Sequence, residues 1–176
     1  MTQAQESPSW RTMTPADLPA VMGVAAVVHP AFPEDEAVFA ERLRLAPEGC
    51  HALAGQDGLL GYCVSHPWPL DAVPALNAQL GDVPMRPANW YIHDLALLPA
   101  ARGGGAAGHI VAAIAGAAVG AGCTSMALVA VSGSAGFWHR QGFRERTVPA
   151  LAAKLASYDD AARYMVRDLT DGGSNA

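Results

Sequence analysis

A glycine cluster in the middle of the chain constrains the fold more than any other feature. Residues 90–98, WYIHDLALL, are aromatic and aliphatic enough for a central strand, and four glycines follow between residues 103 and 108. Residues 105–120 then have the composition of a helix. Glycine lets the backbone adopt angles that side chains forbid and lets it approach a ligand closely. The stretch therefore predicts a strand, a tight turn and a helix start whose free backbone N–H groups suit phosphates.

Three more specific interpretations of this turn make different demands on the sequence around it. A Walker phosphate loop is excluded, because no Gly-Lys-Ser or Gly-Lys-Thr follows the cluster. A dinucleotide fingerprint can be laid on Gly103, Gly105 and Gly108, but three strand candidates precede it and no acidic residue ends the next strand to bind a ribose. A tight turn that holds no ligand is the simplest structural alternative.

The pattern of the rest of the chain predicts one α/β domain with a mixed sheet. A hairpin is expected around Asp57-Gly58, a strong tight-turn signal, and five prolines between residues 66 and 89 indicate a long surface loop. The domain is expected to span residues 1–170, followed by a flexible tail at 171–176. The expected strands are 9–14, the two hairpin segments within 50–66, 90–98, 124–131, 143–148 and 163–169, and the expected helices are 14–29, 33–49, 105–120 and 134–142.

Composition narrows the class of partner. The 176 residues carry a formal net charge of -5 and no dense run of lysine and arginine, which argues against a nucleic-acid or anionic-membrane binder. The acidity favours a cationic small partner, although solubility alone also explains it. Three widely spaced cysteines are typical of reduced thiols and a cytoplasmic protein. The N-terminal sequence has no leader pattern, and no apolar run is long enough to span a membrane.

Two motifs carry a resemblance to a known family. Residues 102–107, RGGGAA, match the pattern Arg/Gln-x-x-Gly-x-Gly/Ala after an apolar strand, and residues 137–143, FWHRQGF, resemble Phe-Tyr-x-x-x-Gly-Phe. Together they resemble the acetyl-CoA-binding motif and the following helix of the GNAT family of N-acetyltransferases. The resemblance is strongest between residues 90 and 146. It implies a single-domain GNAT fold, with a mixed, mostly antiparallel sheet of about six to seven strands and helices on both faces.

The resemblance also implies how the cofactor would bind. In this family the strand before the glycine turn splays from its neighbour, and the pantetheine arm of CoA bonds to its exposed backbone. The pyrophosphate lies on the backbone of the turn, and the helix that follows the next strand packs near the cofactor. The matching cofactor-binding positions here are Leu95, Ala96, Leu97, Arg102, Gly103, Gly104, Gly105, Ala106, Ala107, Gly108, Ser134 and Trp138.

Acyl transfer to an amine needs an uncharged nucleophile, a base and a polarised thioester carbonyl. His93 lies two residues before the expected cofactor contacts, and an imidazole titrates near about 6.5. On a regular strand His93 and Asp94 point to opposite faces, so that only one of them can face the substrate. Three alternatives stay open: His93 as the base, Asp94 as the base or as a group that binds the substrate cation, and both as structural residues of the sheet.

The general acid is where the chain departs from the family. Trp138 takes the place of the tyrosine, and an indole cannot deliver a proton to a thiolate. Ser132, Ser134, Tyr158 and water are the candidate replacements, and the low pKa of a thiol makes an acid less necessary. The acceptor is expected to enter opposite CoA, walled by the first two helices and the proline-rich loop.

The resemblance therefore implies an acetyl-CoA-dependent N-acetyltransferase that acts on a primary amine of a small molecule or of a protein. A non-catalytic acyl-CoA-binding module is the alternative that the missing tyrosine keeps open. His29, His51 and His66 show no metal-ligand spacing, so no metal is expected. The family often forms dimers, and a homodimer is consistent with the resemblance.

Overall fold

The computed structural model describes residues 7–170, in which seven strands form one sheet in the order β1-β2-β3-β4-β5-β7-β6. The tail expected at 171–176 lies outside the described residues. The strands are β1 (Ser9–Thr12), β2 (Cys50–Gly55), β3 (Gly58–Pro67), β4 (Asn89–Leu97), β5 (Ser125–Ala130), β6 (Arg144–Glu145) and β7 (Arg163–Asp168). The α-helices are α1 (Leu18–Val28), α2 (Glu36–Leu45), α3 (Ala106–Gly120), α4 (Ala135–Arg140) and α5 (Ala152–Ala156).

Short 3-10 helices begin on proline, which suits a helix start because its missing N–H would be unpaired there. In the first of them Thr14 and Asp17 form a capping box that leads into α1. In α2 the charges follow the helix dipole, with Glu36 in the first turn and two arginines in the last. The 3-10 helices in the described part of the chain are Pro15–Asp17, Pro47–Gly49, Pro99–Ala101 and Pro149–Leu151.

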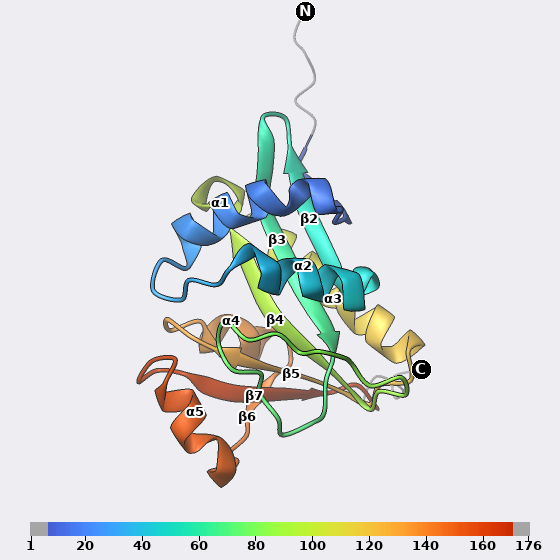
Figure 1. The fold of residues 1–176 in the computed structure, drawn as a ribbon, viewed down its shortest axis with the longest axis vertical. Helices are drawn as coiled ribbons and strands as arrows, with labels where there is room; N and C mark the ends of the chain where they lie inside the picture. The colour runs from blue at the N-terminus through green and yellow to red at the C-terminus, as the bar shows by residue number, and fades with distance from the viewer. Residues whose placement is uncertain (1–6, 171–176) are drawn as a thin grey trace, which may run out of the picture.

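The sheet opens between its two central strands. β1 to β4 form an antiparallel meander, and β5, β7 and β6 form a second antiparallel group. β4 and β5 are parallel and pair only over Asn89–Tyr91 with Ser125–Ala127, after which they diverge (Figure 1). From Ile92 onward the backbone of β4 therefore has no sheet partner on the β5 side within residues 7–170.

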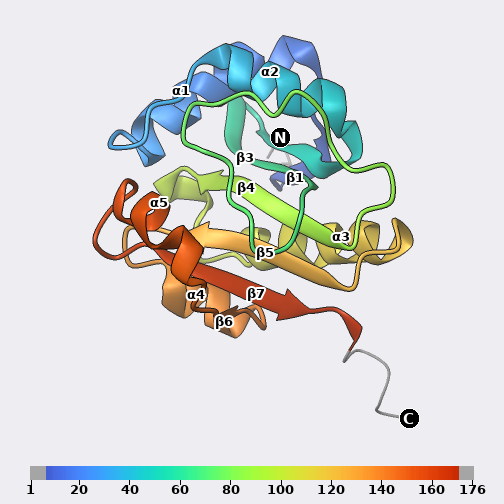
Figure 2. The same ribbon diagram turned by 60° about the horizontal axis from the view of Figure 1, so that its bottom comes forward.

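Helices cover both faces of the sheet (Figure 2). α3 and α4 pack on one face, over a core that includes Trp90, Ile92 and Met126. α1 and α2 cover the other face beside Tyr62 and Val64, and α5 extends that layer over β7. The predicted fold class, a mixed and mostly antiparallel sheet between two helical layers, is confirmed. In the described residues no helix is both long and apolar enough to span a membrane.

The predicted elements agree with the structure except near the C-terminus. The strand expected at 143–148 is reduced to the two residues of β6, and the chain then turns into a 3-10 helix and α5, which were not predicted. The segment is short and begins with Pro149, so no helical periodicity could develop. This missed segment matters for the site, because the chain just after α5 contributes Tyr158 to the cavity described below.

Candidate active site

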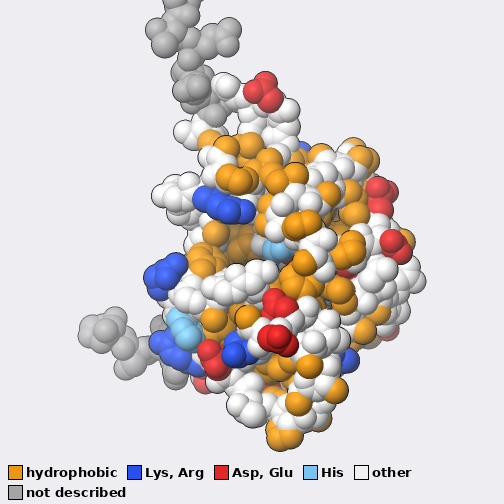
Figure 3. Space-filling model, turned by 90° about the vertical axis from the view of Figure 1, so that its left-hand side faces the viewer, with side chains coloured by type: hydrophobic (Ala, Val, Ile, Leu, Met, Phe, Trp, Pro, Cys, Tyr) orange, Lys and Arg blue, Asp and Glu red, His pale blue; other side chains and the backbone are white. Residues whose placement is uncertain are grey.

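The diverging strands β4 and β5 enclose a cavity of about 880 Å³. One end is formed by the glycine turn and α4, and the other by the segment between α1 and α2 together with the β3–β4 loop and Tyr158. Figure 3 shows this side of the molecule, where the surface is hollowed and a histidine side chain lies inside the hollow. A cavity of this size suits a cofactor arm and a small ligand.

The glycine turn has the geometry that the sequence predicts. Gly103 and Gly105 have φ of +85° and +83°, which L side chains rarely adopt, and Gly105 is the N-cap of α3. An added Cβ at Gly103, Gly104 or Gly105 would meet no neighbouring atom, so the turn is open on its outer side. The Arg102 guanidinium donates from Nε to the Leu97 carbonyl at 3.1 Å and ties the turn to the end of β4. The backbone N–H groups that begin α3 are thus presented to the cavity, where an anion could bind.

Most of the predicted cofactor-binding residues line this one cavity. Ala96 and Gly104 do not: Ala96 points into the core under α1, and Gly104 lies on the exposed outside of the turn. The predicted residues that line the cavity are Leu95, Leu97, Arg102, Gly103, Gly105, Ala106, Ala107, Gly108, Ser134 and Trp138, together with His93 and Asp94.

The expectation that His93 and Asp94 point to opposite faces is wrong. The β3–β4 register runs from Val64 opposite Asp94 directly to Ser65 opposite Ile92, so His93 is the extra residue of a β-bulge. The bulge shifts the alternation by one residue. Both side chains consequently lie on the face covered by α1 and α2, and both line the cavity.

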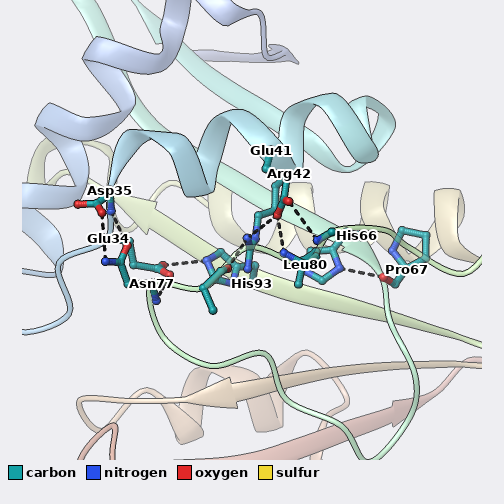
Figure 4. A network of polar contacts seen from close by, with 11 residues as sticks. Glu34, Asp35, Glu41, Arg42, His66, Pro67, Asn77, Leu80 and His93 are labelled. Carbon is teal, nitrogen blue, oxygen red and sulfur yellow. Dashed lines mark hydrogen bonds and ion pairs between the residues drawn. The ribbon is translucent and has the colours of Figure 1, made fainter.

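His93 forms a buried pair with Glu34. Nε2 of His93 lies 2.8 Å from Oε1 of Glu34, and the two side chains are only 5% and 6% exposed. The other carboxylate oxygen accepts the Asn77 backbone N–H at 2.9 Å, a contact drawn in Figure 4. Burial alone would raise the pKa of Glu34, but the His93 contact and the Asn77 N–H outweigh it and lower the pKa below its ordinary value. Glu34 is therefore charged at neutral pH and orients the imidazole.

Asp94 belongs to a second cluster. The Tyr62 hydroxyl donates to Oδ2 at 2.5 Å, and His29 Nε2 lies 2.9 Å from Oδ1, out of line for a hydrogen bond but close enough for an ion pair. Burial alone would lower the pKa of His29, but the Asp94 carboxylate outweighs it and raises the pKa. Burial and the Asp94 charge raise the pKa of Tyr62 well above its ordinary value, so its hydroxyl stays a donor. Both oxygens of Asp94 are thus occupied.

Helix α2 holds the β3–β4 loop over the site (Figure 4). The buried Arg42 side chain donates from Nη1 to the Ala78 carbonyl at 2.8 Å, and the Glu41 carboxylate accepts the backbone N–H groups of Leu80 and Gly81 at 2.5 and 3.1 Å. Charge-assisted hydrogen bonds of this kind are stronger than neutral ones. The loop is therefore fixed where it brings Asn77 to Glu34.

Trp138 is 7% exposed and packs edge-on against Phe143, so its indole is part of the core and of the cavity wall. Ser132, Ser134 and Tyr158, the alternative proton donors, all line the cavity. The Tyr158 hydroxyl donates to the Pro74 carbonyl at 2.9 Å, and burial together with the Glu34 charge raises its pKa to about 12.

Sequence reasoning missed Glu34 and did not place His29 at the site. Both lie in the segment between α1 and α2, whose sequence gives no sign of its position relative to β4. Within residues 7–170 no group of three His, Cys, Asp or Glu side chains is arranged to hold a metal ion.

Comparisons with known proteins agree with this geometry. The model of the acetyltransferase (GNAT) family matches residues 15–143. No curated protein matches the chain significantly in sequence. Several hundred solved chains share the fold.

Three of these structures show the extent of the likeness. The GNAT-like decarboxylase GphF, in complex with isobutyryl-CoA, has a TM-score of 0.74 and 18% identity over 92% of this chain and 99% of its own. Ard1 from Thermoplasma volcanium has a TM-score of 0.69 and 16% identity, covering 92% and 97%. Arabidopsis thaliana Naa50, in complex with a bisubstrate analogue that contains CoA, has a TM-score of 0.66 and 14% identity, covering 92% and 99%.

At these identities the structures establish the fold, whereas the family model covers most of the chain. The family predicted from the two motifs is therefore confirmed, and with it the class of enzyme, an acyltransferase. The chain belongs to the acetyltransferase (GNAT) family.

Proposed function

We propose that the protein is an acetyl-CoA-dependent N-acetyltransferase that transfers the acetyl group directly to a primary amine. The observation that carries the proposal is the single cavity that runs from the glycine turn, along the unpaired edge of β4, to the His93–Glu34 pair. The turn would hold the CoA pyrophosphate, and the backbone of β4 at Leu95 and Leu97, which has no β5 partner, would hold the pantetheine arm. GphF and Naa50, which have this fold, were solved with an acyl-CoA and a CoA analogue.

His93 would act as the base. The charged Glu34 favours the tautomer with its proton on Nε2, which leaves the lone pair on Nδ1, and Nδ1 has no hydrogen-bond partner among the described residues. The amine nitrogen attacks the thioester carbonyl carbon, the C–S bond breaks, and the proton of the amine passes to Nδ1. CoA can depart as a thiolate, because thiols titrate near about 8.5, so the reaction does not require a tyrosine at position 138.

The alternative is a non-catalytic acyl-CoA-binding module, because Trp138 stands where the family has a tyrosine that could act as the general acid. Both functions require the protein to bind CoA, but only the acetyltransferase releases CoA in the presence of an amine acceptor. The first measurement is a thermal-shift comparison of acetyl-CoA, CoA, NAD and ATP, since a ligand that binds only the folded state raises the melting temperature. We expect a rise with acetyl-CoA and CoA alone.

The second measurement is thiol release with a panel of amines, for the wild type, His93→Gln and His139→Gln. His139 is an exposed histidine outside the cavity lining and serves as the matched control. Loss of a general base is expected to lower kcat by about 10²–10⁴-fold in His93→Gln while the acetyl-CoA shift is kept. Equal rates for the three proteins would show that His93 is not the base. CoA binding without turnover of any amine would favour the non-catalytic binding module.

A further inference from the structure

The end of the cavity away from the glycine turn is closed by three chain segments. We call residues 29–35, 73–78 and 154–158 the acceptor roof; they contribute His29, Phe32, Glu34, Leu76 and Tyr158 to the cavity wall. They come from the α1–α2 connection, the β3–β4 loop and the end of α5, and Figure 2 shows the loop running beneath α1 and α2 across the sheet.

Each segment of the acceptor roof contacts the other two. Asn77 links the first two segments, since its side chain accepts the Asp35 N–H at 2.7 Å and its backbone N–H binds Glu34. The second and third segments are joined by Lys154 Nζ, which donates to the Val73 carbonyl at 2.8 Å, and by the Tyr158–Pro74 bond.

The aromatic rings of Phe32 and Tyr158, with centroids 6.3 Å apart, join the first segment to the third and complete the closure. An extended peptide that passed between these segments would break several of these contacts, each hydrogen bond contributing about 1 kcal/mol.

Two carboxylates and one histidine carry the charge at this end, and the histidine, His29, is already paired with Asp94. Glu34 and Asp94 line it, whereas the arginines of the cavity wall, Arg102 and Arg140, lie at the cofactor end, next to the glycine turn and on α4. An ammonium group is attracted to two carboxylates, and a carboxylate on the acceptor would be repelled by them with no lysine or arginine to bind it. Arg42 does not meet this need, because it is fully buried and lies outside the cavity wall.

The rest of the wall at this end is apolar or aromatic. Val28, Phe32, Leu76 and Tyr158 surround the space next to the carboxylates. Burial of an alkyl or aryl group against such a wall is favourable by about 25 cal/mol per Å². The volume is limited, because the cavity of about 880 Å³ also has to accept the acyl end of the cofactor.

We propose, on the basis of the function proposed above, that the acceptor is a small primary amine with an apolar body and no carboxylate, enclosed beneath the acceptor roof. Free amino acids and the N-termini of peptides are poor acceptors. The amine binds as its ammonium ion between Glu34 and Asp94 and releases one proton to the solvent before it attacks. As the amide forms and the C–S bond breaks, the second proton passes to His93 and CoA leaves as the thiolate.

The test compares acceptors that differ in one feature each: isopentylamine, leucinamide, leucine and a tripeptide amide that begins with leucine. With acetyl-CoA saturating, kcat/KM for isopentylamine is expected to exceed that for leucine and for the tripeptide by at least about 100-fold, since an unmatched polar group in a closed site is rejected strongly. Leucinamide, which lacks the negative charge, should fall between isopentylamine and leucine.

Phe32→Ala tests the roof directly, because it removes the contact with Tyr158. It should raise kcat/KM for the tripeptide relative to isopentylamine by about 10-fold, the effect of a few apolar contacts in a pocket. Val27→Ala is the matched control, since Val27 is 61% exposed, close to the same segment and outside the cavity wall.

The outcomes separate the two proposals. Transfer to the tripeptide or to leucine as efficient as to isopentylamine would overturn the acceptor class and leave the acetyltransferase intact. An unchanged preference in Phe32→Ala would overturn the role of the roof. Failure to acetylate any of the four would overturn the acceptor class. Failure with the wider amine panel as well, with the acetyl-CoA thermal shift present, would overturn the proposed function and this inference together.

Discussion

Replacement of Glu34 by glutamine tests the orientation of His93 at constant side-chain size. In the wild type the two carboxylate oxygens accept two different donors, the His93 Nε2–H and the Asn77 backbone N–H. A glutamine offers one oxygen and one NH₂ group in their place. If the oxygen faces Asn77, the NH₂ group faces His93, which must then accept at Nε2 and carry its proton on Nδ1. If the oxygen faces His93, the Asn77 N–H meets a second donor.

The magnitude follows from the burial of the pair. With the two side chains 6% and 5% exposed, water cannot replace a lost bond, so the second orientation leaves an unsatisfied buried donor that costs about 1–3 kcal/mol of folding free energy. The first orientation satisfies every group and is therefore favoured. Placing the imidazole proton on Nδ1 removes the proposed base, so kcat should fall by about 10²–10⁴-fold. Affinity for acetyl-CoA should not change, because the glycine turn is at the other end of the cavity.

The assay measures kcat, the acetyl-CoA dissociation constant and the melting temperature for Glu34→Gln and for Glu36→Gln, an exposed residue in the first turn of α2. Because the folded-state pKa of Glu34 is lowered, its contribution to stability is present above the unfolded pKa of about 4.3 and is lost as the pH falls through the folded value. The stability difference between wild type and Glu34→Gln should therefore shrink in acid. A kcat within about threefold of wild type, against the expected loss for a base, would refute the reasoning.

Two further predictions concern the second histidine and the glycine turn. Because the Asp94 contact raises the folded-state pKa of His29, the pair stabilises the fold fully below the unfolded pKa of about 6.5, and this effect is lost as the pH rises through the folded value. Chemical denaturation between neutral and mildly alkaline pH should therefore show the wild type losing stability relative to His29→Gln. Parallel stability curves for the two proteins would contradict this prediction. Gly105 has a φ of +83°, so Gly105→Ala should lose about 1–2 kcal/mol of stability and bind acetyl-CoA more weakly. Gly104 does not have a positive φ and has open space around it, so Gly104→Ala should keep both stability and binding. Equal melting temperatures for the two variants would contradict the predicted backbone strain at Gly105.

Local patterns in the sequence were sufficient to predict the strand, the glycine turn and α3. An aromatic and aliphatic run, a cluster of glycines and an alanine-rich segment each specify their own backbone, and no contact with a distant residue is needed to recognise them. The same holds for the hairpin at Asp57-Gly58. These elements place the glycine-turn end of the cavity, which is why most of the residues that line it could be named in advance.

The acceptor end depends on contacts between distant residues. Glu34 and His93 are 59 positions apart, and the segment between α1 and α2 has neither a motif nor a periodic pattern. Asn77 is a further example, because its side chain accepts a hydrogen bond from the Asp35 N–H, 42 positions earlier in the chain. A single sequence shows which residue types are available for such contacts and gives no indication of which pairs form.

The bulge in β4 changes how the open alternatives for the base should be weighed. A regular strand would have offered the reaction either His93 or Asp94. The inserted residue brings both side chains to one face, where their partners differ. One oxygen of Asp94 accepts the Tyr62 hydroxyl and the other pairs with His29. A proton that bound to Asp94 would therefore have to displace a contact that joins α1, β3 and β4. His93 uses only Nε2, and its contact with Glu34 favours a free lone pair on Nδ1. The geometry therefore favours His93 as the base and Asp94 as a binding group, because only His93 can accept a proton without loosening the fold around it.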